Sequence, residues 1–157
     1  MDEIKKIILV RHGKYDDSTN QDVGLSQVGI EQIHGLLEKL STFIEKNKTI
    51  KIFTSPFIRT TMSAEIIAQG FKVEKITTIY IMGEDDIDEG KIFDFIKSEE
   101  AQADIIILVT HAQHVRFFPQ FFSFVEWATD REIDKVKPGE AVVIDCLNKK
   151  IIELRRL

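Results

Sequence analysis

The sequence from position 7 to position 13 is Ile7-Ile8-Leu9-Val10-Arg11-His12-Gly13. Four consecutive apolar residues without polar alternation are typical of a strand that is buried on both faces, as in a parallel sheet covered by helices. The run ends abruptly at an arginine, a histidine and a glycine. This stretch predicts a central strand whose carboxyl end presents Arg11 and His12.

The rest of the chain alternates short apolar runs with helical patterns. Strands are expected at 51–54, 75–81, 104–109, 141–147 and 150–154, the last two as a terminal hairpin or two edge strands. Helices are expected from an N-cap at Ser26 to about 44, from Ser55-Pro56 to a stop at Gly70, and over 91–99. The aromatic residues 115–127, interrupted by Pro119, are interpreted as a loop or short turn followed by a helix. The alternation predicts a layered α/β fold with a largely parallel sheet.

Composition excludes several classes of protein. The chain has 157 residues, 43% of them hydrophobic, with no apolar run long enough to cross a membrane and no repeat or linker, so we expect a single domain over 1–157. A net charge of −5 argues against nucleic acid as a partner. Cys146 is the only cysteine and cannot form an intrachain disulfide, which favours a reducing, cytoplasmic location. Neither secretion nor membrane insertion is expected from the short apolar run near the N-terminus.

Cationic and imidazole side chains follow three of the expected strands. Arg11 and His12 follow the first strand, Arg59 lies in the first turn of the helix after the second, and His111 follows the strand at 104–109. In doubly wound sheets, ligands bind where strands end and helices begin. Two guanidiniums, two imidazoles and a helix N-terminus in one crevice suit a phosphoryl group.

Several motifs, in this order along nearly the whole chain, resemble those of the histidine phosphatase superfamily, also called phosphoglycerate mutase-like, and especially its short bacterial phosphohistidine phosphatases. The resemblance rests on Leu9-Val10-Arg11-His12-Gly13, Leu25-Ser26-Gln27-Val28-Gly29, Ser55-Pro56-Phe57-Ile58-Arg59 with Ser63-Ala64 after it, Val109-Thr110-His111, and the closing strands over 139–154. Ser63 occupies a position where the family has threonine. The resemblance implies a three-layer α/β/α fold with a mostly parallel central sheet.

The resemblance also implies a mechanism. His12 would become transiently phosphorylated, while Arg11, Arg59 and His111 hold the phosphoryl oxygens and water releases inorganic phosphate. The substrate would be a phosphorylated protein or small molecule, with no metal and no cofactor. Larger members place a glutamate after the third strand as the proton donor. Glu84 is the candidate here, with Asp85 as the second choice.

Three alternatives remain open from the sequence. A mutase would need a lid that retains the phosphorylated intermediate, and the spans 70–75 and 82–104 are short. A non-catalytic phosphate-binding or interaction module would need no nucleophile, which the presence of His12 argues against. The pair His111 and His114 suggests a metal site, but no third ligand accompanies it.

Overall fold

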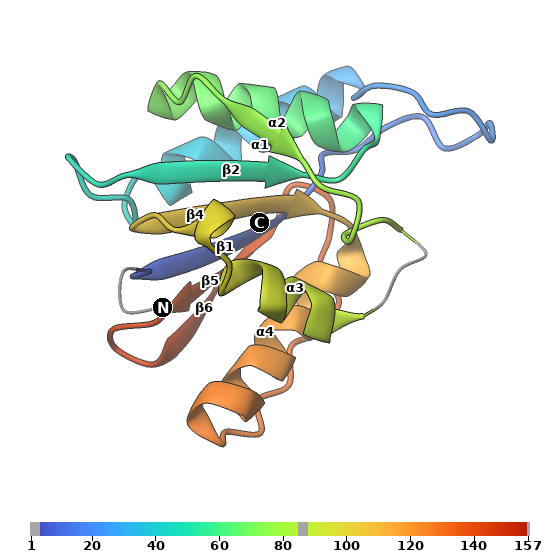
Figure 1. Ribbon diagram of the computed structural model, residues 1–157. Helices are drawn as coiled ribbons and strands as arrows, with labels where there is room; N and C mark the ends of the chain where they lie inside the picture. The colour runs from blue at the N-terminus through green and yellow to red at the C-terminus, as the bar shows by residue number, and fades with distance from the viewer. Residues whose placement is uncertain (1–3, 85–87, 157) are drawn as a thin grey trace.

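One six-stranded sheet forms the centre of the computed structural model, which describes residues 4–84 and 88–156 (Figure 1). The strands lie in the order β3-β2-β4-β1-β5-β6. Neighbours among β1 to β4 pair in parallel, whereas β5 pairs antiparallel with β1 and with β6. The expected mostly parallel sheet and terminal hairpin are therefore confirmed. The bounds are β1 Lys6–Arg11, β2 Ile50–Thr54, β3 Ile76–Thr78, β4 Ile105–Thr110, β5 Ala141–Asp145 and β6 Lys150–Leu154.

Helices cover both faces of the sheet, which makes three layers. Figure 1 shows α1 and α2 on one face and α3 and α4 on the other. The helices are α1 Gln27–Leu40, α2 Ile58–Phe71, α3 Glu89–Ile96 and α4 Ala112–Trp127, with a short 3₁₀ turn at Glu99–Ala101. Ser26 caps α1 as expected, since its side chain accepts a hydrogen bond from the amide of Gly29.

The alternation of side chains along β1 divides the core in two. Ile8 and Val10 pack into the cluster under α1 and α2, and Ile7 and Leu9 pack into the one under α3 and α4. Every residue of β4 is buried. These two strands are central because apolar side chains on both of their faces are removed from water.

The register of the central strands brings three strand ends to one edge of the sheet. Arg11 on β1 pairs with Thr110 on β4, and Thr54 on β2 pairs with Val109. The residues that follow these strands, including His12, Ser55 and His111, therefore begin their loops side by side.

Helix α2 differs from the sequence prediction at both ends. Its N-cap is Phe57, not Ser55. Gly70 lies inside the helix, which continues to Phe71 and has Lys72 as its C-cap, in a left-handed conformation with φ 57°. A Cβ at Gly70 would lie 2.7 Å from the Leu37 side chain, so this glycine serves the close packing of α1 against α2 rather than a helix stop.

Two further elements also differ from expectation. Helix α4 begins immediately after His111 and runs through Pro119, although proline in a helix costs about 3 kcal/mol. Burial of Phe118 and Phe122 on either side offsets this cost, because both belong to the core under α4. Strand β3 has only three residues, so that residues 79–84 are left to run toward the strand ends.

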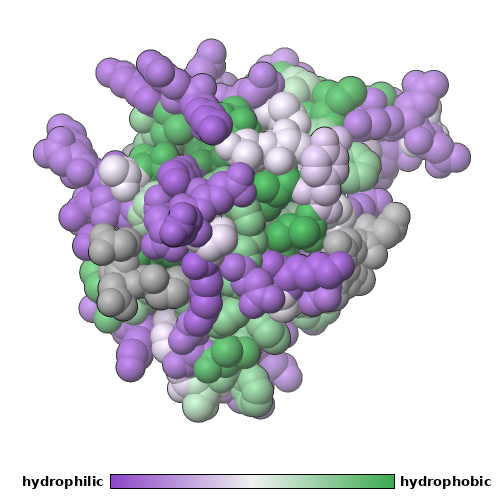
Figure 2. All heavy atoms as spheres, in the orientation of Figure 1, coloured by the Kyte–Doolittle hydropathy of each residue, from purple (hydrophilic) through white to green (hydrophobic). Residues whose placement is uncertain are grey.

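The surface is polar with scattered apolar residues. On the face shown in Figure 2, hydrophilic side chains predominate, and hydrophobic ones show between them in the upper and central parts as well as at the lower end. Within 4–84 and 88–156, no helix has the length and apolar character needed to span a bilayer.

Candidate active site

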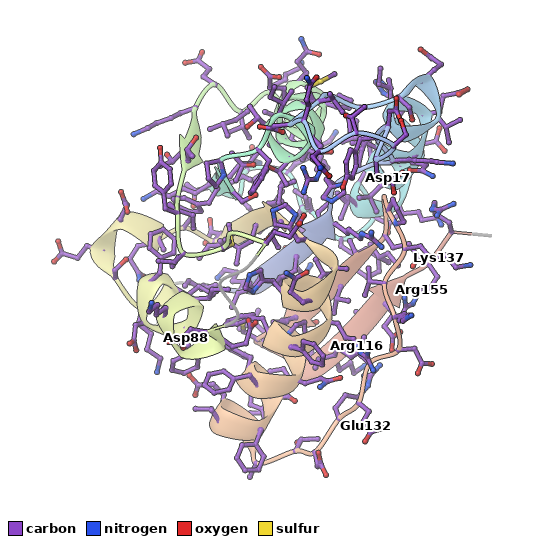
Figure 3. All side chains as sticks on the ribbon, turned by 90° about the vertical axis from the view of Figure 1, so that its right-hand side faces the viewer. Asp17, Asp88, Arg116, Glu132, Lys137 and Arg155 are labelled. Carbon is purple, nitrogen blue, oxygen red and sulfur yellow. The ribbon has the colours of Figure 1, made fainter. Side chains whose placement is uncertain are left out.

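The four residues singled out from the sequence lie together at the carboxyl edge of the sheet. Arg11 is the last residue of β1 and His12 follows it, His111 is the N-cap of α4, and Arg59 is the second residue of α2. The His12 and His111 rings lie edge to face with their centroids 5.4 Å apart. Figure 3 views the molecule from this edge.

His12 is held as a neutral imidazole with one defined tautomer. Its Nδ1 lies 2.8 Å from the carbonyl oxygen of Gly13, which can only accept, so Nδ1 carries the hydrogen and Nε2 the lone pair. Burial, followed by the charges of Arg59 and Arg11, lowers the pKa of His12 from 6.5 to about 4, although the bond to Gly13 opposes this shift. At neutral pH, Nε2 is therefore unprotonated.

A chain of hydroxyl groups orients His111. The Thr60 hydroxyl lies 2.8 Å and 2.9 Å from the carbonyls of Ser55 and Phe57, so its hydrogen points to them and its oxygen accepts from Ser55 Oγ at 3.0 Å. Ser55 Oγ in turn accepts from His111 Nε2, also at 3.0 Å. Burial, then the neighbouring charges of His12 and Arg59, lower the pKa of His111 to about 3. In the ligand-free protein, Nδ1 of His111 consequently carries a lone pair.

Two aromatic rings hold the Arg59 guanidinium. Its Cζ lies 4.3 Å from the centre of the Tyr15 ring and 4.6 Å from that of Phe57. Tyr15 also contacts the edge of His12, and Phe57 that of His111. Arg59 is only 4% exposed, and the two rings stabilise its buried positive charge without a buried carboxylate among the described residues.

Three buried nitrogen atoms around His12 lack a hydrogen-bond partner among the described residues: Arg11 Nε, Arg59 Nε and His111 Nδ1. A buried polar atom without a hydrogen-bond partner costs about 1–3 kcal/mol, whether it is a donor, as on the two arginines, or an acceptor, as on His111. Such atoms clustered at one place make it a candidate binding site for the oxygens of a ligand. An oxyanion fits, because both guanidiniums are positive and His111 can gain a proton beside a negative charge.

Glu84 reaches the same place from the segment after β3. Its carboxylate is hydrogen-bonded to Arg59 Nη2, and Oε2 lies 3.7 Å from His111 Nδ1. Among the described carboxylates that pair with Arg59, it lies nearer to the guanidinium than Asp22, which is 3.9 Å from Nη1. The side chain is half-exposed, so that it can turn toward solvent. Asp85, the second candidate, lies outside the described residues.

Residues at the end of β4 and the start of α4 hold the segment that carries Glu84. Thr110 Oγ1 donates to the carbonyl of Met82 at 3.0 Å, His114 Nε2 to that of Gly83 at 3.0 Å, and Gln113 Nε2 to that of Glu84. Three successive carbonyls are thus fixed. His114 Nδ1 faces Glu89 at 2.9 Å, so its ring has partners other than those of His111.

Ser63 and two glycines fix the turn after β1. Ser63 Oγ accepts from the Gly13 amide at 3.0 Å and donates to the Arg59 carbonyl at 2.8 Å, which joins the turn after His12 to α2. A Cβ at Gly13 would lie 2.5 Å from the oxygen of Gly29, and one at Gly29 would lie 2.1 Å from that of Lys14. Both positions therefore require glycine.

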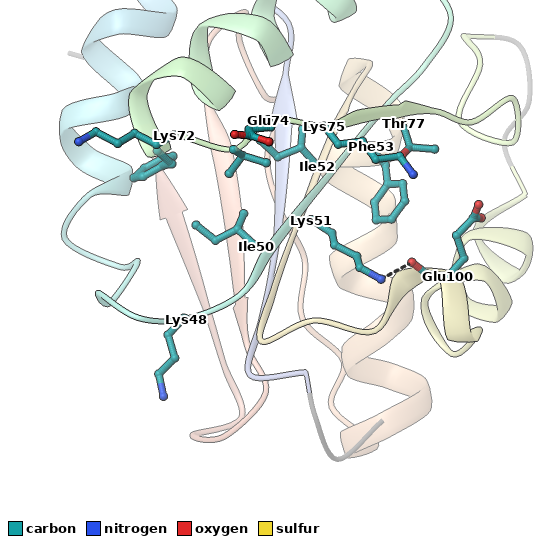
Figure 4. A pocket seen from close by; sticks show the side chains of 12 residues that line it. Lys48, Ile50, Lys51, Ile52, Phe53, Lys72, Glu74, Lys75, Thr77 and Glu100 are labelled. Carbon is teal, nitrogen blue, oxygen red and sulfur yellow. Dashed lines mark hydrogen bonds between the residues drawn. The ribbon is translucent and has the colours of Figure 1, made fainter.

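A cavity of about 620 Å³ lies elsewhere, along β2 and β3 (Figure 4). Lysines and apolar side chains line it, and the Lys51 ammonium donates to the carbonyl of Glu100 at 2.9 Å. None of the candidate site residues reaches it.

Several residues of the site are not predicted from the sequence. Tyr15 lies in a polar loop without periodicity, and no local signal marks it. Phe57 and Thr60 lie inside the motif around Arg59, at positions where the motif does not specify a residue. The sequence predicts Ser55 as a helix cap and as part of the motif around Arg59, but its contact with His111 depends on the pairing of β2 with β4.

Comparisons with known proteins concern the family and the fold of the chain. Residues 7–84 match the model of the histidine phosphatase superfamily, branch 1. No protein with a curated description matches the sequence. Among solved structures, the protein histidine phosphatase SixA complexed with tungstate is 13% identical, with a TM-score of 0.69 over 94% of this chain and 93% of that one.

Two other similar structures are phosphatases named for different substrates. Mycobacterial glucosyl-3-phosphoglycerate phosphatase, complexed with VO3, is 13% identical, with a TM-score of 0.66 over 97% of this chain and 98% of that one. Phosphoserine phosphatase from Entamoeba histolytica, in a mutant form complexed with phosphoserine, is 12% identical, with a TM-score of 0.64 over 94% of each chain. Identities this low establish a shared fold. The family match over residues 7–84 shows that the chain belongs to the histidine phosphatase superfamily.

Proposed function

We propose that this protein is a phosphatase that transfers a phosphoryl group from its substrate to His12 and then to water, releasing inorganic phosphate without a metal or cofactor. The observation that carries the proposal is the ring of unpartnered buried nitrogens on Arg11, Arg59 and His111 around a neutral His12. Phosphatases among the structures with this fold support it.

The state of His12 suits nucleophilic attack. Nδ1 donates to Gly13, which leaves the lone pair on Nε2, and the lowered pKa keeps that lone pair available at neutral pH. The P–N bond forms at Nε2 as the bond to the leaving oxygen or nitrogen breaks. Water then attacks phosphorus, and His12 leaves as the neutral imidazole.

The other three residues bind the transferred group. Arg11 and Arg59 can each donate an unpartnered Nε–H to it, and His111 donates from Nδ1 once an anion raises its pKa and Nδ1 gains a proton. Buried, preorganised donors stabilise the charge on the phosphoryl oxygens in the transition state more effectively than water does. These positive groups supply the electrostatic role that a metal ion has in other phosphotransfer enzymes.

Glu84 is positioned to act on the leaving group. As a carboxylate beside Arg59 it would repel a phosphate dianion, whereas as a carboxylic acid it can donate a hydrogen bond and then a proton. An alkoxide needs that proton to leave, but the imidazole of a phosphohistidine needs it much less. We take phosphohistidine on a protein, whose leaving group depends least on Glu84, as the preferred substrate, with small phosphate monoesters as the wider class.

A panel of phosphorylated compounds tests the proposal. The native protein should release phosphate from p-nitrophenyl phosphate and, more efficiently, from phosphohistidine, and His12→Ala should lose this turnover by about 10²-fold or more. Binding of phosphate or tungstate without turnover of any substrate would instead identify a non-catalytic module. Equal turnover by His12→Ala would exclude His12 as the nucleophile.

A further inference from the structure

A second cavity adjoins the candidate active site and shares two residues with it. It has a volume of about 450 Å³, within the range of small-molecule sites, and its lining includes Arg11, Lys14, Tyr15, Gln32, Pro138 and Arg156. Arg11 and Tyr15 also belong to the surroundings of His12. Arg11 and Tyr15 therefore form a boundary that the cavity shares with the surroundings of His12.

Positive charge predominates in the cavity. Arg11, Lys14 and Arg156 face one carboxylate in the lining, that of Asp17, in a protein whose net charge is −5. After burial, which is the largest cause, the Arg156 charge is among those that lower the pKa of Arg11, while Tyr15 and Glu140 oppose it. The two guanidiniums are thus near enough to repel each other, and an anion between them would relieve that repulsion.

The segment 136–140 fixes both guanidiniums. Arg11 Nη1 donates to the Val136 carbonyl at 2.7 Å, and Arg156 Nε donates to the Pro138 carbonyl at 2.7 Å. The backbone amide of Arg156 is held by the Glu140 carboxylate, also at 2.7 Å. Figure 3 labels Asp17, which belongs to the cavity lining, on the loop after β1.

The terminal nitrogens of Arg156 are available for a ligand. Among the described residues, Arg156 makes one side-chain hydrogen bond, and it is the bond that Nε donates to Pro138. The guanidinium is thus oriented from its Nε side, whereas the fork of Nη1 and Nη2 matches the two oxygens of a carboxylate or phosphate.

We propose that this cavity binds a second anionic group, a carboxylate or a phosphate, of the substrate whose phosphoryl group reacts at His12. This inference rests on the proposed function and narrows its substrate class. The second anion can belong to a small molecule or to an acidic side chain next to the phosphorylated residue of a protein.

Matched substrates test it. The small pair is 4-carboxyphenyl phosphate and 4-carbamoylphenyl phosphate, and the peptide pair is a phosphohistidine peptide with glutamate or glutamine beside the phosphorylated residue. In at least one pair the native protein should prefer the charged member by about tenfold in kcat/KM, mainly through KM. The pair with the larger preference identifies the source of the anion.

Substitutions show which residue causes the preference for the charged substrate. Arg156→Gln should abolish it by slowing hydrolysis of the charged member about tenfold while leaving the neutral member within about twofold. Lys137→Gln removes a charge from the same segment, outside the cavity lining, and should preserve the preference. Equal use of both members in both pairs by the native protein, or an equal loss for both in Arg156→Gln, would overturn the inference while leaving the phosphatase activity in place.

A binding measurement separates this inference from the proposed function. If no substrate is hydrolysed, the proposed function fails, and calorimetric titration of His12→Ala with the same pairs still examines the cavity. Tighter binding of a charged member, lost on adding Arg156→Gln, supports the second anion site. Equal binding of charged and neutral members refutes it.

Discussion

Replacing His12 by asparagine should make the folded protein less sensitive to acid. His12 is 3% exposed, and its pKa is lowered from 6.5 to about 4, first by burial and then by Arg59 and Arg11. Between these values the unfolded chain binds a proton at His12 and the folded chain does not. Unfolding is therefore favoured as the pH falls, and the stabilisation is present in full only above the unfolded pKa.

The size of the effect follows from the two pKa values. Linkage gives a loss of about 2 kcal/mol in the free energy of unfolding from this one histidine when the pH falls from 7 to 5. Urea unfolding at both pH values measures the loss for each protein. His12→Asn should lose about 2 kcal/mol less than the native protein does.

The control for this measurement is His34→Asn. His34 is exposed on α1 and lies outside the candidate site, so His34→Asn shows the effect of replacing a histidine that is not buried. If His12→Asn loses as much stability on acidification as the native protein, the folded state does not hold His12 with a lowered pKa, and the reasoning about a neutral nucleophile is wrong.

Three further predictions concern the chemistry. Glu84→Gln should impair hydrolysis of alkyl phosphates by about 10²-fold or more while sparing p-nitrophenyl phosphate, because the phenolate leaves without a proton donor. Equal rates for Glu84→Gln and the native protein on an alkyl phosphate would show that Glu84 is not the acid. Tungstate binding at pH 7 should take up about one proton, because His111 Nε2 already donates to Ser55 and Nδ1 must gain a hydrogen before it can donate to the anion. Titration calorimetry in buffers of different ionisation enthalpy measures this uptake. Binding without proton uptake would contradict the role of His111 Nδ1 as a donor to the anion. EDTA should leave phosphate release unchanged, whereas inhibition reversed by a divalent metal would contradict a mechanism based on cationic side chains.

The ends of the two central strands, β1 and β4, are predicted from this sequence better than the helix ends, whereas β3 is shorter than the expected 75–81. The apolar runs before Arg11 and His111 are uninterrupted, and burial on both faces leaves few alternatives to a central strand. Glycine and proline signals are less reliable, because tertiary packing can override local preference. Gly70 makes room for Leu37 instead of ending a helix, and Pro119 lies within α4.

The charged residues of the candidate site are predictable from the sequence, whereas the residues that support them are not. Arg59 is marked by its motif, but the rings that hold it, Tyr15 and Phe57, come from a loop and from an unspecified motif position. Likewise, Glu84 can be named from the acidic segment after β3. Its contact with Arg59 depends on the side chains of Thr110, Gln113 and His114, which only the assembled sheet and α4 bring to the carbonyls of residues 82–84.

Trapping the phosphoenzyme tests the central claim most directly. The native protein, quenched during turnover of an aryl phosphate and digested at alkaline pH, should carry one acid-labile, base-stable phosphoryl group, which tandem mass spectrometry places on His12. Arg59→Ala, which retains the nucleophile but weakens the binding of the phosphoryl oxygens, should accumulate less of it. A phosphoryl group on another residue, or turnover of the native protein with no phosphohistidine at any quench time, would contradict the account.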